Sequence, residues 1–387
     1  MFSNNLSNEK DVFSGFNVIN PITSLKEISN LKDISLGNVA VFPFSKEEHL
    51  IARFEKLINA DKIDYYSFKR HGSTNKKISD ILPNCDNEKI VNSFKNLVFS
   101  NYDTLILGHI KELSLLDQVS YNKLIAESIS NNIRILCFDN LEEFFKKFNC
   151  YYLSKIDKNH ILDTKHKLFN TSKPVIMVAG TSSSQGKFTL QLKLRERLLG
   201  AKYNVGQIGT EPSSLLFGFD SSFPCGYGSN IELSITQIIE YVNQQLWEIS
   251  EKDVDVIVCG TQSGLIPILK NNSYNFPIIH QIFFQTVNPD VVVLCVNIYD
   301  DMKVILNTIK YAESVSNGKV LGLVCFPLKI KSNWEGNLGK KINISNSEYI
   351  LFKKNVFKNT GLPVYLLSND DDINNLTNNI LMYFSKK

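Results

Sequence analysis

Short apolar runs alternate along the chain with segments whose apolar residues recur every three or four positions. In the first part of the chain the runs are rich in β-branched and aromatic residues, which is typical of strands. They are NVAVFPF (38–44), IDYYSF (63–68), DTLILGHI (103–110) and NIRILCF (132–138). Between them, KEEHLIARFEKLINA (46–60) and YNKLIAESISNN (121–132) have helical spacing. Strands separated by helices predict a parallel, doubly wound sheet.

A second series of the same kind begins at Val175. Its predicted strands are VIMVAG (175–180), YNVGQIG (203–209), VDVIVCG (254–260), DVVVLCVN (290–297) and VLGLVCF (320–326). Its predicted helices are FTLQLKLRERLLGA (188–201), ELSITQIIEYVNQQLWEI (232–249) and MKVILNTIKYAESVSN (302–317). Because these strands are apolar almost throughout, we expect helices on both faces of the sheet.

The length of 387 residues and a hydrophobic content of 43% are enough for two domains. We predict an N-terminal extension (1–36), a Rossmann-like α/β domain (37–153), a polar linker (154–173) and a second α/β domain (174–387). No G-x-G-x-x-G follows a strand in the first domain, so the sequence does not support a dinucleotide site there.

Composition narrows the class of protein further. The 42 Lys and Arg residues against 39 Asp and Glu give a net charge of +3 without a basic run, so no nucleic-acid partner is expected. Seven scattered cysteines without a C-x-x-C pair indicate reduced thiols and a cytoplasmic protein. No window reaches the roughly 18 apolar residues of a membrane helix. The expected partner is a small-molecule substrate, and a homo-oligomer is compatible with the sequence.

The stretch VIMVAGTSSSQGKFTL (175–190) carries the clearest chemistry. Five residues separate Gly180 from Gly186, and Lys187 follows, so the loop is one residue longer than G-x-x-x-x-G-K-[ST]. The hydroxyl that usually follows the lysine is displaced to Thr189. A strand leads into the loop and a helix leaves it, which places backbone N–H groups and a lysine where they can hold an anion. The predicted phosphate-binding residues are Gly180, Thr181, Ser182, Ser183, Ser184, Gln185, Gly186, Lys187, Phe188 and Thr189.

The segment GTSSSQGKFT (180–189) resembles the variant loop G-T-[DS]-x-x-V-G-K-x-T of a prokaryotic P-loop family. The characterised member of that family is D-glutamate N-acetyltransferase, and the spacing up to the lysine also resembles dethiobiotin synthetase. NVGQIGTEPSSLLFGF (204–219) and VDVIVCGTQSGLIP (254–267) resemble the second and third strands of the family with their turns, and NPDVVVLCVN (288–297) matches its next strand. The resemblance covers roughly residues 174–300. It implies a P-loop NTPase-like second domain and a Rossmann-like first domain.

One position departs from this family. Both related groups have an acidic residue at the end of the third strand, where this chain has Cys259. Such an acid orients Mg²⁺ or its waters, so its absence puts metal-assisted phosphoryl transfer in doubt. Glu211 and Glu232 are candidate substitutes, and we leave the metal unassigned. Cys259 itself ends an apolar strand, which favours a buried, inert thiol over a nucleophile.

The resemblance leaves three functions open. The first is an acetyl-CoA-dependent N-acyltransferase acting on a small amino-acid-like carboxylate, and the second is an ATP-dependent kinase or ligase that would use Mg²⁺. The third is a nucleotide-binding scaffold or sensor without turnover. The candidate catalytic residues are Lys187, Glu211 and His280, although a histidine is more often structural. The candidate substrate-binding residues, which ordinary turn chemistry also explains, are Thr210, Ser213, Ser214, Thr261, Gln262 and Ser263.

Overall fold

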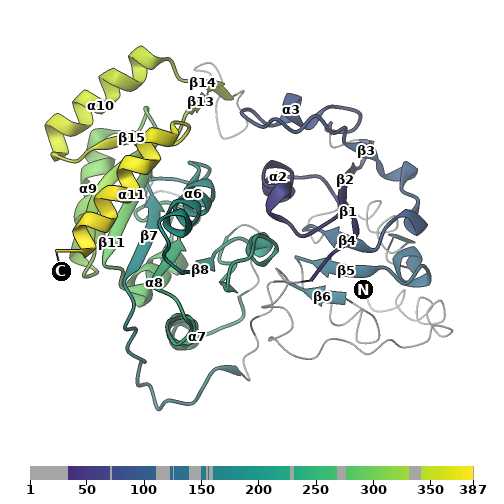
Figure 1. Cartoon of the computed structure of the whole chain (residues 1–387), viewed down its shortest axis with the longest axis horizontal. Helices are drawn as coiled ribbons and strands as arrows, with labels where there is room; N and C mark the ends of the chain where they lie inside the picture. Colours follow the sequence, from purple (N-terminus) through teal and green to yellow (C-terminus); the bar gives the residue numbers. More distant parts are fainter. Residues whose placement is uncertain are drawn as a thin grey trace, which may run out of the picture. The chain divides into compact units, whose positions relative to one another are not determined.

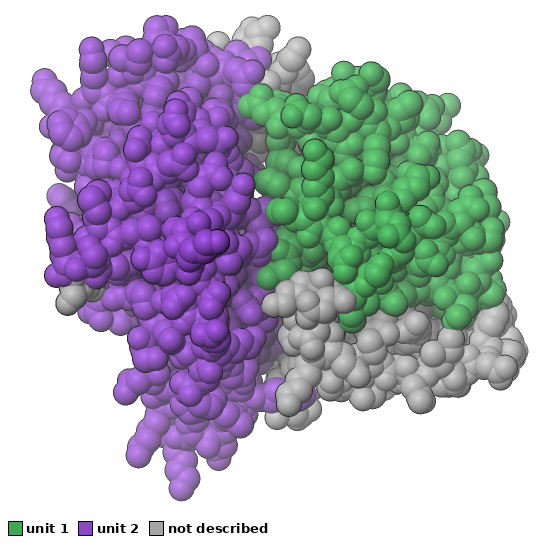
Figure 2. Space-filling view, viewed as in Figure 1, with its two compact units in different colours: residues 1–155, 215–218 green, residues 156–214, 219–387 purple. Residues whose placement is uncertain are grey.

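The computed structural model describes residues 34–69, 72–109, 123–124, 126–138, 150–153, 156, 160–226, 231–267, 276–330 and 341–386. The chain forms two compact units, coloured separately in Figure 2. Unit 1 comprises residues 1–155 with 215–218, and unit 2 comprises residues 156–214 and 219–387. Most of the predicted N-terminal extension, residues 1–33, lies outside the described residues, as do 154–155 and 157–159 of the predicted linker.

Unit 1 is built on a six-stranded parallel sheet with the strand order β3-β2-β1-β4-β5-β6 (Figure 1). Its strands are β1 Asn38–Phe42, β2 Lys62–Ser67, β3 Asn92–Ser93, β4 Thr104–Leu107, β5 Arg134–Cys137 and β6 Cys150–Tyr152. Its helices include α2 Glu48–Arg53 and α3 Ile78–Ile81, with 3₁₀ turns η3 Glu55–Leu57, η5 Phe94–Asn96 and η6 Phe99–Asn101. Residues 123–124 and 126–130, within the segment predicted as a helix, are also helical. The strand order reverses direction at β1, as in doubly wound sheets.

The predicted helix over residues 46–60 is wrong in its extent. The α-helix α2 ends at Arg53, and Phe54 leaves the helical region with φ −122° and ψ 25°. The chain then makes a 3₁₀ turn in which Glu55 accepts hydrogen bonds from the Tyr65 hydroxyl at 2.9 Å and the Asn87 amide at 3.0 Å. Contacts with distant residues therefore override the local helical period.

Unit 2 contains a seven-stranded sheet with the order β15-β12-β11-β7-β10-β8-β9, and every described pairing in it is parallel. Its strands are β7 Val175–Gly180, β8 Val205–Gly209, β9 Ser221–Ser222, β10 Val256–Gly260, β11 Val291–Val296, β12 Lys319–Cys325 and β15 Val364–Leu366. A separate antiparallel pair joins β13 Leu328–Ile330 to β14 Lys341–Asn343. The central strand β7 is buried along its whole length between β10 and β11.

Helices cover both faces of this sheet, as the continuously apolar strands predict. The helices are α6 Lys187–Gly200, α7 Ile235–Ser250, α8 Ile278–Val287, α9 Met302–Ser314, α10 Asn346–Thr360 and α11 Asp370–Phe384, and η8 Pro212–Phe217 is a 3₁₀ segment. On one face α6 and α11 pack together over Ile176 and Val178 of β7. On the other face α7, α8 and α9 enclose a larger core that includes Met177. Figure 1 shows α6 beside α11.

The described part of the predicted linker, residues 160–173, belongs to unit 2. Leu162 donates its N–H to the Gln244 side chain at 2.9 Å, and Phe169 donates to the Asn243 side chain at 2.7 Å. The ring of Phe169 also stacks on Trp247 with centroids 4.3 Å apart. This segment therefore satisfies two amides of α7 that are otherwise buried.

The predicted fold class, α/β with two parallel-sheet domains, is confirmed by these two sheets. No helix among the described residues is both long enough and apolar enough to span a bilayer.

Candidate functional site

The loop between β7 and α6 lies at the carboxyl end of the central strand of unit 2. Ser184 and Gly186 adopt left-handed backbone conformations with φ of 57° and 81°. At Gly186 such a φ favours glycine, and a Cβ would also lie 2.3 Å from Cδ2 of Leu367. Helix α6 begins directly after Gly186. The loop thus places the N-terminus of a fourteen-residue helix at the switch point of the sheet, where anions bind.

Lys187 folds back over this loop. Its side chain is buried, and Nζ donates a hydrogen bond of 2.6 Å to the carbonyl oxygen of Ser182. Its positive charge adds to the effect of burial in lowering the pKa of His280. At Asp300 the same charge lowers the pKa and so opposes the effect of burial. The lysine therefore lies inside the loop at a place where its ammonium group can exchange a backbone carbonyl for a phosphate oxygen.

Asp300 is a functional candidate that sequence analysis missed. It follows β11, and its Oδ2 accepts hydrogen bonds from the Thr181 hydroxyl at 2.5 Å, the Gln185 amide at 3.2 Å and the Asn297 N–H at 2.8 Å. Burial raises the pKa of Asp300, and these donors and the charge of Lys187 oppose that effect. The signal that could have revealed Asp300 is an acid in the turn that follows a fully apolar strand.

The side chains of the predicted phosphate-binding residues divide into two groups. Thr181 and Gln185 are buried and bonded to each other at 2.8 Å and to Asp300, so they shape the loop from inside. The ring of Phe188 is buried and stacks on Phe219 with centroids 5.3 Å apart. By contrast, Ser183 and Ser184 are exposed on the loop. Hydroxyls and backbone N–H groups, rather than the Thr181 and Gln185 side chains, are placed to meet a ligand.

The turns after β8 and β10 lie against each other. The Gln262 amide donates to the carbonyl oxygen of Thr210 at 2.8 Å and to the Glu211 carboxylate, and the Thr210 hydroxyl donates to the Gly260 carbonyl at 3.1 Å. The structure thus brings Glu211 and Gln262 together at the ends of the neighbouring strands β8 and β10. Ser213 and Ser214 are buried, and Ser214 bonds the Glu211 carbonyl at 2.7 Å.

The turn after β10 also supports the phosphate loop. The Leu265 N–H donates to the Gly180 carbonyl at 3.2 Å, and the Thr261 N–H donates to the Val178 carbonyl at 3.0 Å. A Cβ at Gly264 would lie 2.1 Å from the Thr181 carbonyl oxygen. The Thr261 hydroxyl reaches the Ser263 carbonyl at 3.5 Å, within its own turn. The backbone of this turn is therefore packed directly on the loop.

His280 lies in the first turn of α8, and its Nδ1 is 3.3 Å from the Sγ of Cys225. Both side chains are buried, with exposed fractions of 8% and 6%. Burial, together with a smaller effect of the Lys187 charge, lowers the pKa of His280 to about 4. Burial raises the pKa of the Cys225 thiol, and the negative charge of Glu211 adds to this. At neutral pH the pair is therefore a thiol beside a neutral imidazole.

Cys259 is fully buried in β10, and burial raises the pKa of its thiol to about 12. Its surroundings are apolar and belong to the core between the sheet and α7. Among the described residues no group of three or more acidic, histidine or cysteine side chains is arranged to hold a metal ion. At the position for which the resemblance implies an acid, the chain therefore has a neutral thiol, which lacks the carboxylate oxygens of a magnesium ligand.

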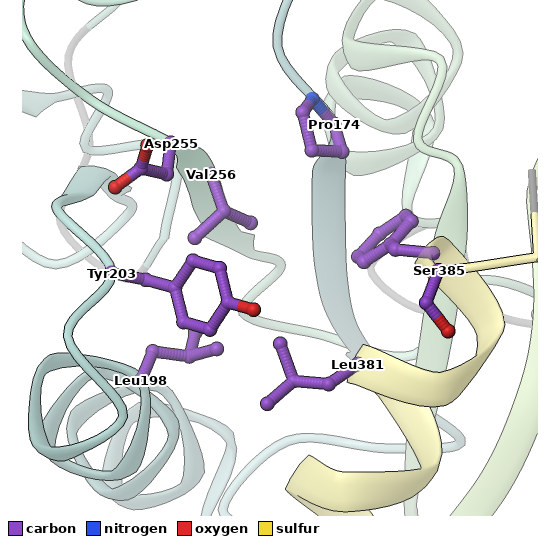
Figure 3. Close-up of a pocket in the computed structure, with 8 residues that line it drawn as sticks. Pro174, Leu198, Tyr203, Asp255, Val256, Leu381 and Ser385 are labelled. Atoms are coloured by element: carbon purple, nitrogen blue, oxygen red, sulfur yellow. The ribbon is translucent and has the colours of Figure 1, made fainter.

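Cavities in each unit are lined by residues other than those of the phosphate loop. In unit 2 a cavity of about 230 Å³ lies at the amino ends of β7 and β10, where Leu198 of α6 and Leu381 of α11 face Tyr203 (Figure 3). In unit 1 a cavity of about 490 Å³ is lined by residues that include Phe44, His49 and Lys76. The anion site at the loop is instead closed by the contact of Lys187 with Ser182.

Comparison with known families supports the interpretation of the loop. Residues 160–307 match the profile of a domain of unknown function described as the DUF1611_C P-loop domain. These residues form a P-loop domain. The match includes the loop, the turns after β8 and β10, and Asp300, whereas the narrower assignment to the D-glutamate N-acetyltransferase type stays a prediction. Among curated proteins, no match is found.

Solved structures resemble the chain at low sequence identity. A DUF1611 family protein from Anabaena variabilis has 12% identity and a TM-score of 0.62, and the match covers 90% of this chain and 100% of the other. This likeness shows a shared fold along most of the chain. A nucleotide-binding protein from Archaeoglobus fulgidus in complex with ADP has 14% identity, a TM-score of 0.33 and coverage of 58% and 92%. Cobyrinic acid a,c-diamide synthase from Mycobacterium smegmatis, with ADP and magnesium, has 12% identity, a TM-score of 0.38 and coverage of 55% and 96%.

Proposed function

We propose that the P-loop domain is an N-acyltransferase that holds the phosphates of an acyl-CoA donor at residues 180–187. The acceptor is the amine of a small amino-acid-like carboxylate, as the resemblance to D-glutamate N-acetyltransferase implies. The observation that carries the proposal is the buried Lys187, which lies at the switch point of the sheet and within electrostatic range of the neutral base His280. Phosphate anchor and proton acceptor are thus parts of one site.

The loop supports phosphate binding through its backbone and its lysine. Ser182 offers a carbonyl oxygen to Nζ of Lys187 at 2.6 Å, and a bound phosphate would take over this contact. The N-terminus of α6 adds the positive end of the helix dipole. Coenzyme A carries such phosphates on an adenosine core, so the loop suits it as well as it suits ATP.

The acids of the site favour acyl transfer over phosphoryl transfer. Phosphoryl transfer on P-loops uses Mg²⁺ with a carboxylate, and β10 has the neutral thiol of Cys259 near its end instead. Asp300 is near the loop, but its Oδ2 already accepts three hydrogen bonds from the protein. Acyl transfer from a thioester needs instead a neutral base, and the depressed pKa of His280 keeps its imidazole unprotonated at neutral pH.

An ATP-dependent kinase or ligase is the second candidate, and Glu211 favours it. This carboxylate lies in the turn after β8, next to the turn after β10, and accepts a hydrogen bond from Gln262. Glu211 could replace the acid that is absent at Cys259, and Mg²⁺ would then be held between the Glu211 carboxylate and the phosphates. A domain that binds nucleotide without turnover is the third candidate.

Calorimetric titration separates these candidates. The full chain is titrated with acetyl-CoA, CoA, ADP, and ATP with and without Mg²⁺, and release of CoA is then followed with D- and L-amino acids as acceptors. We expect acetyl-CoA to bind without Mg²⁺, and Lys187→Met to weaken this binding at least about 10-fold because the phosphate contact is lost. Lys193→Ala is the matched control, since Lys193 lies on the same helix and pairs with Asp370 at the surface.

If the chain binds ATP with Mg²⁺ but does not bind acetyl-CoA, the acyltransferase proposal is wrong and the kinase or ligase is favoured. Binding without turnover of any acceptor would favour the scaffold. Full ligand affinity in Lys187→Met, with an unchanged melting temperature, would remove the site from the loop altogether.

A further inference from the structure

The segment after β9 and the first turns of α8 make two parallel contacts beside the phosphate loop. The rings of Phe223 and Phe283 stack with centroids 5.5 Å apart and an interplanar angle of 5°. Cys225 is two residues after Phe223 in the segment, and His280 is one turn before Phe283 on the helix. The Sγ of Cys225 lies 3.3 Å from Nδ1 of His280. Residues three apart share a helix face, and residues two apart share a side of an extended segment. The aromatic stack therefore holds the thiol against the imidazole.

The backbone of this segment is fixed as well. The Phe223 N–H donates to the Gly209 carbonyl at 2.8 Å, which joins the segment to the end of β8, and the Cys225 N–H donates to the Phe223 carbonyl at 2.8 Å. Gly226 lies against Gln262, because a Cβ there would overlap the Gln262 amide. The thiol is thus positioned by the same strand ends that present Glu211 and Gln262.

Two charged residues of the candidate site shift the pKa values of this pair. Lys187 disfavours protonation of His280, and Glu211 disfavours ionisation of Cys225. The resting pair is neutral, so a proton leaves the sulfur only while a new bond to the sulfur forms. Binding of donor phosphates neutralises Lys187, which makes His280 a stronger base at the moment when the donor is present. Cys259 and Cys295, by contrast, lie within β10 and β11, and neither has an imidazole as its described partner.

We propose that Cys225 is the nucleophile of a covalent acyl-enzyme step, with His280 as its general base. This inference rests on the proposed acyl-CoA-dependent function. The Cys225 sulfur attacks the thioester carbonyl, a bond from this carbon to Cys225 forms, and its bond to the CoA sulfur breaks. The thiol proton passes through His280 to the departing CoA thiolate. The acceptor amine then attacks the carbonyl of the acyl-Cys225 thioester, and the amide C–N bond forms as the bond from this carbon to the Cys225 sulfur breaks. One amine proton passes through His280 to the released Cys225 sulfur.

Isotope exchange without an acceptor tests this step. The full chain is mixed with acetyl-CoA and labelled CoA, and transfer of label into acetyl-CoA is followed, since such exchange needs a covalent acetyl-enzyme. We expect exchange in the wild type, a loss of at least about 100-fold in Cys225→Ala and a loss of about 10- to 100-fold in His280→Gln. Cys85→Ala, a buried thiol of unit 1, serves as the matched control and keeps the wild-type rate.

Mass spectrometry of the same reaction locates the acetyl group. We expect a hydroxylamine-labile acetyl group on the peptide that contains Cys225, while the other cysteine peptides of the digest stay unmodified. Melting temperature and acetyl-CoA affinity of Cys225→Ala report whether the variant is folded. If the chain binds acetyl-CoA but shows no exchange, or if Cys225→Ala exchanges normally, the inference is overturned. Acylation of an amine by Cys225→Ala would leave the proposed function standing, whereas absence of acetyl-CoA binding would remove that function itself.

Discussion

Asp300 ties the phosphate loop to the end of β11 through one carboxylate oxygen. Asparagine at this position keeps the size of the side chain but loses its charge, and its amide nitrogen cannot accept a hydrogen bond. The bonds from Thr181, Gln185 and Asn297 then weaken or lose their acceptor. We expect Asp300→Asn to reduce affinity for the phosphate ligand about 10-fold, measured by titration calorimetry.

Asp301→Asn is the control for this prediction. Asp301 is the neighbouring acid and caps α9 by accepting the Lys303 N–H at 2.8 Å, a role that asparagine also fills. The Asp301→Asn substitution removes one negative charge at the neighbouring position and leaves the bonds between Asp300 and the loop in place. Equal effects of the two substitutions would mean that charge alone matters and that Asp300 does not hold the loop.

At the scale of elements, the turn after β10 and the phosphate loop are packed backbone to backbone. A Cβ at Gly264 would lie 2.1 Å from the Thr181 carbonyl oxygen and 2.8 Å from its carbon, so the loop must move to accept it. We expect Gly264→Ala to reduce affinity for the phosphate ligand at least about 10-fold and to lower the melting temperature. Gly200→Ala is the matched control, because no atom lies within 4 Å of a Cβ there. Wild-type affinity in Gly264→Ala would contradict the packing of this turn on the loop.

The elements that the sequence predicts are those with local signals. Strand β7, the loop and α6 follow from an apolar run, a glycine pair with a lysine, and a helical period, all within residues 175–200. Helices α8, α10 and α11 and strand β15 were not predicted, although α11 completes the face on which α6 packs. Their burial depends on strands that lie elsewhere in the chain.

The candidate site shows the same division. Lys187, Glu211 and Gln262 could be singled out because each lies in or near a recognisable turn, and His280 because it is the single histidine of residues 174–387. The residues that these side chains contact could not be predicted, because they are far away in the sequence. Thr181 and Asp300 are 119 residues apart, and Cys225 and His280 are 55 residues apart. Such contacts are set by strand order, which a single sequence does not reveal.

At the scale of the whole molecule, the family match ends before the structure of unit 2 does. Residues 160–307 include the loop, but β12, β15 and α11 follow later in the chain. Leu190 and Leu194 of α6 share a buried cluster with Leu376 and Ile380 of α11. Each such leucine contributes about 1.5–3 kcal/mol when it is buried. The C-terminal part is therefore required for the helix that carries Lys187 to be held against the sheet.

Two buried ionisable groups give the units opposite dependences on pH. In unit 1, burial raises the pKa of Glu48 from 4.5 to about 7, and Ser45 donates to its carboxylate. The folded state therefore holds this proton more tightly than the unfolded state, so the stability it contributes is complete below about pH 4.5 and is lost as pH rises through 7. In unit 2 the pKa of His280 falls from 6.5 to about 4, so its contribution is present above about pH 6.5 and is lost as pH falls toward 4.

Both shifts correspond to roughly 3 kcal/mol at full effect. We expect the stability of Glu48→Gln, measured relative to the wild type, to be greater at pH 8 than at pH 5. The reason is that glutamine need not be ionised in the core. His280→Gln should show the reverse, with its relative gain at pH 5. The measurement is the free energy of unfolding of the wild type and both variants at the two pH values. Each variant is its own control, since losses of packing are equal at both pH values and cancel in the difference. Differences that do not change between pH 5 and pH 8 would show that these two groups titrate alike in the folded and unfolded states.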